Sequence, residues 1–554
     1  MKQIKRLQVG GIPIISSIIE KLELKRILSK HVKLHGNAKI STVESLMIVL
    51  YSVVTGRRPL YELNDWLSNI HPQCFGFDTF EMGIFNDDRF GRSIEKANEA
   101  DRATIITEVI VTMIDKFGIK MDQLHNDSTT LKSYGKMPGK TKSGLELKRG
   151  KSKDHRPDLK QLVYTLTVSA DGAVPIHYKA YCGNRTDDTT HIESWEALKK
   201  IVCRPDFLYV ADSKVCTKKQ LDHIVGNEGR VVTIMPETWG EVGEFKEEMR
   251  KRTKRKKEIL RKAIPGTFDG IEYYFSISGN YQTRKEGYRI HWIFSSEKKK
   301  RDLASREQAL AKTEKELIAL LPKLNKRALK TRQEIEEKCN SVLNKRTVEK
   351  YYSVSIAEVM EKERVQVGKG RPCLNTKYEE KITVIYTLSW TRNKDMLKAE
   401  RKTDGIFPLL STDTKLSAKE VLDAYKYQPR LEKRFEQLKQ VLLGAPLLFK
   451  KIERIEGMML MLFLGLLVQA LIEREVRKAM KQEEIEKIFI YPEERPAAAP
   501  TTSIILDRFE NVSVYHLQEN DMVIEKYKDE LTMIQKEILR LLDIQPNEYW
   551  VNKE

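Results

Sequence analysis

The stretch that decides the fold runs from residue 159 to residue 183 and reads LKQLVYTLTVSADGAVPIHYKAYCG. Strand-like halves lie on either side of Asp171-Gly172, a pair typical of tight turns, so the stretch predicts a two-stranded hairpin. The residues before it, QLHNDST at 123–129, also look like a strand. A helical pattern at 191–202 and a short apolar run, FLYVADS at 207–213, follow it. Three strands, a helix and a further strand predict an α/β domain.

Other patterns flank and interrupt this domain. Residues 1–118 are expected to be helical, with a capping box from Ser41 to Glu44 ahead of an apolar helix face. Residues 296–345 predict a helical hairpin or short coiled coil broken at Pro322, with strand-like runs before and after it. A final helical pattern covers residues 525–544.

These patterns divide the chain into five expected segments. They are a helical N-terminal domain at 1–118, the first part of the core at 119–239, an insertion of strands and a helical hairpin at 240–405, the second part of the core at 406–490, and a helical tail at 491–554.

The charge of the chain favours a polyanionic partner. Lys and Arg number 98 against 79 Asp and Glu, which leaves a net charge of +19. Residues 132–160 and residues 246–262 each hold ten basic and three acidic side chains. Each cluster could be a solvated face or loop, or it could contact DNA. Nucleic acid is the simplest partner for this balance of charge.

Cysteine usage and hydropathy exclude several other classes of protein. The six cysteines form no CxxC pair and have no metal-ligand spacing with the ten histidines, which argues against a disulfide scaffold and a zinc site. The N-terminus lacks a convincing cleavage site, and the longest apolar stretch, residues 457–472, is shorter than the roughly 20 residues of a membrane span. We expect a cytoplasmic protein without a membrane partner, and a buried core helix at 457–472.

Three carboxylates stand out against this background. Asp127 lies at or near the end of the first predicted strand, and Asp212 ends the apolar run at 207–213. An aspartate in such a position is unfavourable unless it is paired, hydrogen-bonded or bound to metal. Because Ser follows each aspartate, a helix cap or a turn is the alternative for either one alone.

The third carboxylate, Glu432, lies on a predicted helix that is rich in Lys and Arg. Apolar residues recur there at one helical face, and Glu432 lies at the edge of that face; they are Leu431, Phe435, Leu438 and Leu442. A first-turn acid favoured by the helix dipole is the simpler interpretation of Glu432 alone. Taken together, two strand aspartates and a helix glutamate supply hard oxygen ligands suited to Mg²⁺ or Mn²⁺. Two such ions can promote phosphodiester chemistry.

The chain resembles the bacterial and archaeal insertion-sequence transposases of the DDE class. One group of that family has a strand-rich insertion before its glutamate and a Tyr-x2-Arg-x3-Glu-x6-Lys signature. Tyr425, Gln428, Glu432 and Lys439 match its spacing, with Gln428 where arginine is usual. Further similar segments span nearly the whole chain; they are FNDDRFGRSIEKA near residue 90, YGKM at 134–137, GKSKDHRPDLKQLV at 150–163, GNRTDD at 183–188 and YPEERPAAAPTTSIIL at 491–506.

The resemblance implies a ribonuclease H-like catalytic core and a role for each matched residue. Asp127, Asp212 and Glu432 would hold two Mg²⁺ or Mn²⁺ ions. Tyr425 and Lys439 would contact phosphates of the transposon ends. The contact expected at Gln428 would fall to Lys426 or Arg430.

Several neighbouring residues compete with these assignments. Glu436, one turn after Glu432, and Glu420 are the nearby alternatives to the helix glutamate. The acid pairs Asp87-Asp88 and Asp187-Asp188 are interpreted as turn or helix-start residues. Structural roles are also expected for the remaining candidates, which are His125, His155, Trp239, Trp292 and Trp390.

The expected activity is binding of the terminal inverted repeats of an insertion sequence, cleavage there, and joining of the 3′ ends to target DNA. The resemblance implies a homodimer in a synaptic complex at the prokaryotic nucleoid. Residues 1–118 are the candidate for reading the ends. A catalytically silent DNA-binding protein derived from a transposase is the alternative, and a nuclease without strand transfer is a second one.

Overall fold

A computed structural model describes most of the chain. The residues outside the described part are 1, 34–38, 82, 135–138, 142, 152–155, 157, 187–188, 253–261, 264–271, 327, 369, 373–376, 443–450, 520–521 and 551–554. Much of both basic clusters and parts of the transposase-like segments near 134–137, 150–163 and 183–188 therefore lie outside it, as do His155, Asp187 and Asp188. The described chain forms two compact units, residues 1–233 with 423–554 and residues 234–422.

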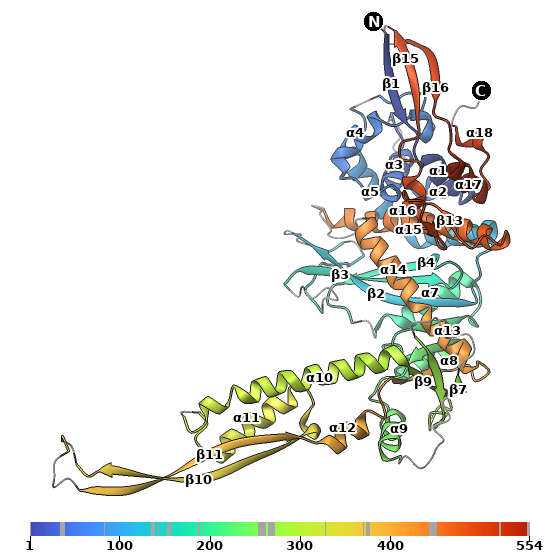
Figure 1. The fold of residues 1–554 in the computed structure, drawn as a ribbon. Coiled ribbons are helices and arrows are strands. Elements are labelled where there is room, and N and C mark those ends of the chain that lie inside the picture. The colour runs from blue at the N-terminus through green and yellow to red at the C-terminus, as the bar shows by residue number, and fades with distance from the viewer. Residues whose placement is uncertain are drawn as a thin grey trace. The chain divides into compact units, whose positions relative to one another are not determined.

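The first unit contains five neighbouring strands of a large mixed sheet, in the order β4-β3-β2-β5-β6. Strands β2, β3 and β4 are labelled in Figure 1. Their bounds are β2 Gln123–Ser133, β3 Lys160–Ser169, β4 Pro175–Cys182, β5 Leu208–Ala211 and β6 Arg230–Ile234. The first three pair antiparallel, whereas β5 runs parallel to both β2 and β6. The predicted hairpin and the predicted α/β class are confirmed.

Helices make up much of the rest of the first unit. They are α1 Ile12–Lys21, α2 Leu24–His31, α3 Thr42–Val54, α4 Leu63–Ser68, α5 Asp87–Glu99, α6 Arg102–Phe117, α7 His191–Val202, α8 Lys218–Gly226, α14 Gln428–Glu436, α15 Ile452–Gln482, α16 Thr502–Asp507, α17 Met533–Leu541 and α18 Pro546–Tyr549. Helix α3 begins at the predicted capping box, in which Ser41 Oγ accepts from Glu44 N–H and the Glu44 carboxylate accepts from Ser41 N–H.

Helix α15 is the centre of the core of this unit. It is long and apolar enough to cross a membrane, and its most apolar window is entirely buried in the structure. It packs against α3, α5 and β4. Gly457 lets α15 approach α5 closely, because a Cβ there would lie 2.1 Å from the Ile94 carbonyl oxygen. The prediction of a buried core helix at 457–472 is confirmed.

The two ends of the chain differ from the helical structure expected for them. Strand β1 (Lys2–Gln8) pairs with β15 (Ser513–Glu519), which pairs with β16 (Met522–Lys528) in a three-stranded sheet. The helix expected from residue 525 begins only at Met533. The expectation of a wholly helical tail is therefore wrong for residues 513–528. Pairing between strands at opposite ends of the chain leaves no signal in local periodicity.

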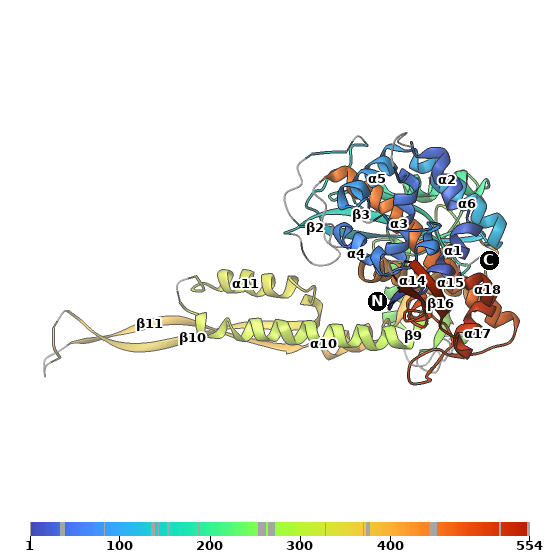
Figure 2. The same ribbon diagram turned by 90° about the horizontal axis from the view of Figure 1, so that it is seen from above.

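The second unit combines strands with a helical hairpin. Its strands β12-β9-β8-β7 are neighbours, and a separate pair joins β10 to β11. The elements are α9 Gly240–Lys251, β7 Lys262–Ala263, β8 Tyr274–Ile277, β9 Arg289–Ser295, α10 Ser296–Ile318, α11 Arg332–Asn344, β10 Tyr352–Gln366, β11 Tyr378–Arg392, α12 Lys394–Glu400 and β12 Ile406–Ser411. Helices α10 and α11 form the predicted hairpin beside the β10–β11 ribbon (Figures 1 and 2). Helix α13 (Ala418–Lys426) crosses the boundary between the units and leads into α14.

Candidate functional site

The register of two parallel strands brings the two predicted aspartates together. Strands β2 and β5 pair Leu124 with Tyr209 and His125 with Val210. Asp127 lies two residues after His125, and Asp212 lies two residues after Val210, directly after the end of β5. Neighbouring strands are about 4.8 Å apart, so the two chain segments leave the paired region close to each other. The charges of both aspartates act on Tyr209 of β5.

The expected position of Asp127 needs one correction. Asp127 was expected at or near the end of its strand, but β2 continues to Ser133. Beyond the last residue paired with β5, β2 pairs with β3 alone as far as Ser133. The aspartate therefore lies where the pairing between β2 and β5 ends, rather than where β2 ends.

Local hydrogen bonds orient both carboxylates. Ser128 N–H donates to Asp127 Oδ1 over 2.7 Å, and Lys214 N–H donates to Asp212 Oδ1 over 3.0 Å. The bond to Lys214 is the turn-starting role that was the alternative for Asp212. The Asp212 side chain is nevertheless 40% exposed, so a turn role and contact with a ligand are compatible.

The charges of the three carboxylates affect the pKa values of two tyrosines. Burial raises the pKa of Tyr209 well above its usual value, and the charges of Asp212 and Asp127 raise it further. Burial also raises the pKa of Tyr425, to which the charges of Asp212 and Glu432 add. Asp212 therefore acts on both tyrosines, on Tyr209 together with Asp127 and on Tyr425 together with Glu432.

Gln428 connects helix α14 to strand β2 by hydrogen bonds. The Gln428 Nε2 donates to the Asn126 carbonyl oxygen over 3.1 Å, which leaves its Oε1 to accept from His125 Nδ1, also 3.1 Å away. Gln123 Nε2 lies 2.8 Å from His125 Nε2 and donates to it, so the imidazole is neutral. Burial lowers the pKa of His125 to about 4, in keeping with this neutral form. His125 is structural, as expected.

Hydrogen bonds also connect α14 to the turn between β3 and β4. Ala173 N–H donates to the Tyr427 hydroxyl over 2.8 Å. Arg434 donates to the carbonyl oxygens of Ala173 and Gly172 and forms a buried ion pair with Glu473 of α15, with Nη1 2.9 Å from Oε2. These contacts hold the helix at both of its ends.

This anchoring fixes the position of Glu432. It lies one helical turn after Gln428, and its side chain is exposed while Leu431 and Phe435 on the neighbouring face are buried. Of its two rivals, Glu420 caps α13 by accepting from the Ser417 hydroxyl over 2.6 Å. Glu436 is exposed one turn further along the helix.

The predicted DNA-contacting residues differ in their surroundings. Arg430 is exposed, with its guanidinium 5.1 Å from the centre of the Tyr427 ring. Lys439 is half-buried in η6 (Gln437–Val441), a π-helical segment that directly follows α14. The amide of Gln428 bonds to protein groups, so its direct contact is with strand β2.

The three carboxylates are a donor set of the kind that binds divalent cations. Carboxylate oxygens on two adjacent strands and a nearby helix are the ligand type that Mg²⁺ and Mn²⁺ prefer. Within the part of the chain that the structure describes, no three His, Cys, Asp or Glu side chains lie together closely enough to hold one ion. The residues therefore fit the ion by the chemistry of their oxygen donors.

The remaining candidates have structural roles. Asp87 and Asp88 begin α5, whose N-cap is Asn86. Trp292 is buried and stacks on Phe245, with ring centres 3.7 Å apart.

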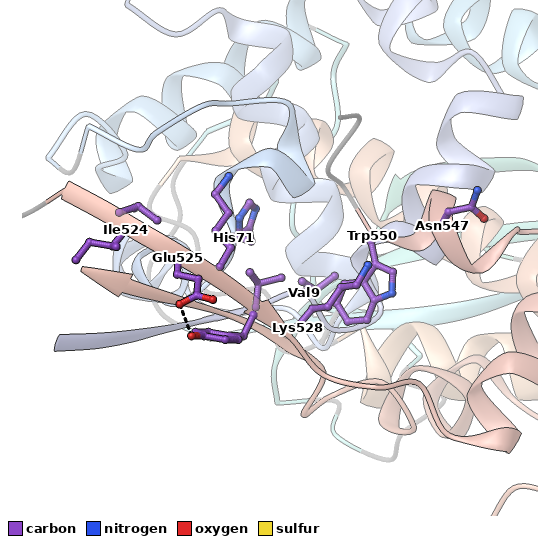
Figure 3. A pocket seen from close by; sticks show the side chains of 11 residues that line it. Val9, His71, Ile524, Glu525, Lys528, Asn547 and Trp550 are labelled. Carbon is purple, nitrogen blue, oxygen red and sulfur yellow. Dashed lines mark hydrogen bonds between the residues drawn. The ribbon is translucent and has the colours of Figure 1, made fainter. Parts of the chain in front are cut away.

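A separate cavity of about 610 Å³ lies beside β16 and is lined in part by His71, Glu525, Lys528 and Trp550 (Figure 3). A dashed line in that view marks the bond from the Tyr527 hydroxyl to Glu525. None of the predicted site residues lines this cavity.

Three residues that position α14 have no counterpart in the sequence analysis. Tyr427, Arg434 and Glu473 contact groups that are distant in the chain. Arg434 is one of many basic residues on this helix, and only its burial distinguishes it. The sequence signal for a buried Arg434 was its position three residues after the apolar Leu431, because a side chain at that spacing lies on the same, buried face of the helix.

Comparison with known proteins gives limited information. Residues 3–111 match a family described as a domain of unknown function, DUF4277. No curated protein matches the chain. The chain has a weak structural similarity to the cryo-EM structure of a piggyBac transposase synaptic complex with hairpin DNA. The two chains are 9% identical and the TM-score is 0.35, over 82% of this chain and 74% of that chain. A TM-score of this size does not establish a common fold.

Proposed function

We propose that this chain is a DDE-class DNA transposase with a ribonuclease H-like core, in which Asp127, Asp212 and Glu432 form the catalytic site. The single observation that carries the proposal is the register of β2 and β5, in which Asp127 and Asp212 each follow the last paired residues, His125 and Val210, by two positions. The anchored helix α14 adds Glu432, whose charge acts on Tyr425 together with that of Asp212. The net charge of +19 supports DNA as the substrate.

In this proposal each residue of the site has a definite task. Asp127 and Asp212 would hold divalent cations between the strands, and Glu432 would complete the ligand set. Bound Mg²⁺ or Mn²⁺ supplies a Lewis acid and lowers the pKa of water or of a 3′-hydroxyl. The contacts of Gln428 and Arg434 keep α14 in register with β2, which limits the movement of Glu432. Arg430 and Lys439 would bind backbone phosphates of the DNA.

The proposal is tested by cleavage of DNA that carries the sequences flanking this chain's own gene, with Mg²⁺ or Mn²⁺ present. Asp127→Asn, Asp212→Asn and Glu432→Gln remove one charge each and nearly conserve shape. We expect each to lower the cleavage rate at least about a hundredfold, because losing even an outer-shell partner of a metal typically costs 10–100-fold. DNA binding, measured in parallel by gel retardation, should remain.

Glu436→Gln is the matched control, since it lies on the same helix one turn away and is also exposed. It should retain cleavage within a few-fold of the wild type. Equal loss in Glu436→Gln and Glu432→Gln would contradict the assignment of Glu432. Retained cleavage in either aspartate variant would contradict the whole site.

A catalytically silent DNA-binding protein is the second candidate. The observation in its favour is that, among the described residues, no three potential ligands lie together closely enough to hold one ion. Such a protein would bind the same DNA and would not cut it with either metal. Product analysis separates a transposase from a simple nuclease, because only a transposase joins the cleaved 3′ ends to a second DNA.

A further inference from the structure

A buried histidine lies beside one of the two strand aspartates. His191 is the first residue of α7 and is 3% exposed. Its Nε2 is 3.8 Å from Asp212 Oδ1, and its Nδ1 is 3.0 Å from the hydroxyl oxygen of Tyr209. The Tyr209 side chain is fully buried. The imidazole therefore connects a buried hydroxyl of β5 with the carboxylate that follows the same strand.

The two neighbours of this ring decide which of its nitrogens carries hydrogen. A carboxylate can only accept a hydrogen bond, whereas a tyrosine hydroxyl can donate or accept. A lone pair on Nε2 would be repelled by the Asp212 carboxylate, so the hydrogen is on Nε2 and Nδ1 accepts from Tyr209. Protonation of Nδ1 would reverse only the bond to Tyr209. In both protonation states His191 directs an N–H group at Asp212.

The surroundings of His191 hold its ring in one orientation. Helix α7 packs against β4, α6 and α8. The rings of His191 and Tyr209 meet edge to face, with centres 6.1 Å apart and planes at 82°. A side chain that packing has already ordered loses little further conformational entropy when it binds a second group. The N–H group is thus a fixed donor, whereas Asp212 is 40% exposed in a turn.

Two polar groups approach Oδ1 of Asp212. Lys214 N–H donates to it over 3.0 Å from within the turn, and His191 Nε2 lies 3.8 Å away on α7. Thr233 Oγ1 donates to the Asp212 carbonyl oxygen over 2.7 Å, which holds the main chain to β6. A distance of 3.8 Å is longer than a hydrogen bond, and contacts of this kind often shorten when a site binds its ligand. The carboxylate is therefore oriented through one oxygen by α7 and by its own turn.

We infer that His191 is a positioning residue, which directs Nε2–H at the Asp212 carboxylate and orients that carboxylate toward a divalent cation. This inference rests on the proposed function, in which Asp212 is a metal ligand. Ligating carboxylates are themselves hydrogen-bonded, and loss of one such partner typically costs 10–100-fold in metal affinity or activity. Local sequence patterns do not identify His191, because the contact joins the start of α7 to the turn after β5.

The test is Mn²⁺ binding by the full chain without DNA, measured as the loss of the electron paramagnetic resonance signal of free Mn²⁺. His191→Phe keeps a planar ring in the core and removes the N–H group, so the Mn²⁺ dissociation constant should rise at least about tenfold. His191→Gln restores a donor, because its side-chain amide reaches about as far as Nε2. It should stay within about threefold of the wild type and recover most of the DNA cleavage that His191→Phe loses.

The matched control is His71→Phe. His71 is also buried, at 5% exposed, and its ring packs edge to face on that of His516, with centres 5.4 Å apart. The substitution makes the same chemical change at a buried histidine that packs on another imidazole instead of a carboxylate. It should leave the Mn²⁺ dissociation constant within about twofold of the wild type. Circular dichroism and the melting temperature of each variant verify folding.

Each other outcome contradicts the inference. Unchanged Mn²⁺ affinity and cleavage in His191→Phe would remove His191 from the site and leave the proposed function intact. Equal weakening in His191→Phe and His191→Gln would show that the shape of the imidazole, rather than its N–H group, matters. Equal weakening in His71→Phe and His191→Phe would assign the effect to the loss of any buried histidine. A wild type that neither binds Mn²⁺ nor cuts DNA would overturn the proposed function together with the inference, and that failure appears before any substitution is made.

Discussion

At the scale of single residues, the site depends on buried polar side chains that bond to neighbouring elements. His125 is the clearest case, because its two ring nitrogens bond to Gln123 and Gln428 and its ring lies 4.7 Å from that of Tyr427. A neutral imidazole serves both bonds, whereas a protonated one cannot accept from Gln123. The position of α14 is therefore linked to the protonation state of one histidine.

This link predicts a loss of stability in acid. The native pKa of about 4 lies below the usual 6.5, so between these values the unfolded chain binds more protons than the native one. Stability from His125 is complete above pH 6.5 and is lost as pH falls toward 4, by roughly 2 kcal/mol at pH 5. His125→Gln should show a smaller fall in melting temperature between pH 7.5 and pH 5 than the wild type.

The control for this substitution is His223→Gln on α8, where the side chain is 35% exposed and bonds to Glu196. Its fall in melting temperature should match that of the wild type. An unaltered pH dependence in His125→Gln would show that His125 does not carry the effect. Burial lowers the pKa of His71, His177 and His291 to about 4 as well, so some acid sensitivity should remain.

At the scale of elements, close packing of α15 against its neighbours supports the sheet and α14. Arg434 of α14 pairs with Glu473 of α15, and Arg474 of α15 pairs with Asp171 in the turn between β3 and β4. These ion pairs are buried or half-buried, so removal of one partner leaves an uncompensated charge. The long core helix thus holds the elements that carry the site.

Gly457 provides a test of this packing. In Gly457→Ala the new methyl group would meet the Ile94 carbonyl oxygen, so α15 and α5 must separate. We expect a loss of about 1–3 kcal/mol of unfolding free energy. Gly226→Ala in α8 is the control, because nothing lies within 4 Å of its new Cβ, and it should be neutral or slightly stabilising. Thermal unfolding of the two variants measures the difference, and equal melting temperatures would contradict the close approach.

At the scale of the whole molecule, the chain is interrupted and its charge is uneven. Residues 234–422 stand between Asp212 and Glu432 in sequence, yet all three carboxylates belong to the unit formed by 1–233 and 423–554. Basic side chains are concentrated at residues 132–160 and 246–262, which each hold ten basic and three acidic side chains.

The net charge predicts a steep dependence of DNA binding on salt. Each phosphate contact releases counterions, so affinity falls as salt rises. The dissociation constant for a random-sequence duplex should increase at least roughly tenfold between 50 mM and 200 mM NaCl. Circular dichroism at both concentrations serves as the control for folding. Affinity that does not change with salt would contradict an electrostatic interface.

Much of the local structure was predictable because it depends on residues close in sequence. The capping boxes at Ser41 and Ser417, the hairpin around Asp171-Gly172 and helix α7 are fixed by side chains within a few positions of each other. Apolar residues at Leu431, Phe435, Leu438 and Leu442 are buried as their helical spacing predicts. Asp127 and Asp212 could be identified as candidates for the same reason, whereas the choice of Glu432 over Glu436 depended on the spacing from Tyr425 in the transposase signature.

By itself, the sequence determined the α/β class, the buried core helix, the helical hairpin and the basic character of the chain. Only the tertiary structure decided that β1 pairs with β15, that β2 pairs with β5 in the register that brings Asp127 and Asp212 to the same end of that pairing, and that Gln428 and Arg434 hold the helix of Glu432. The reason is physical. Periodicity and capping report energies between neighbours along the chain, whereas strand register and buried polar contacts depend on groups that meet only after the chain has folded.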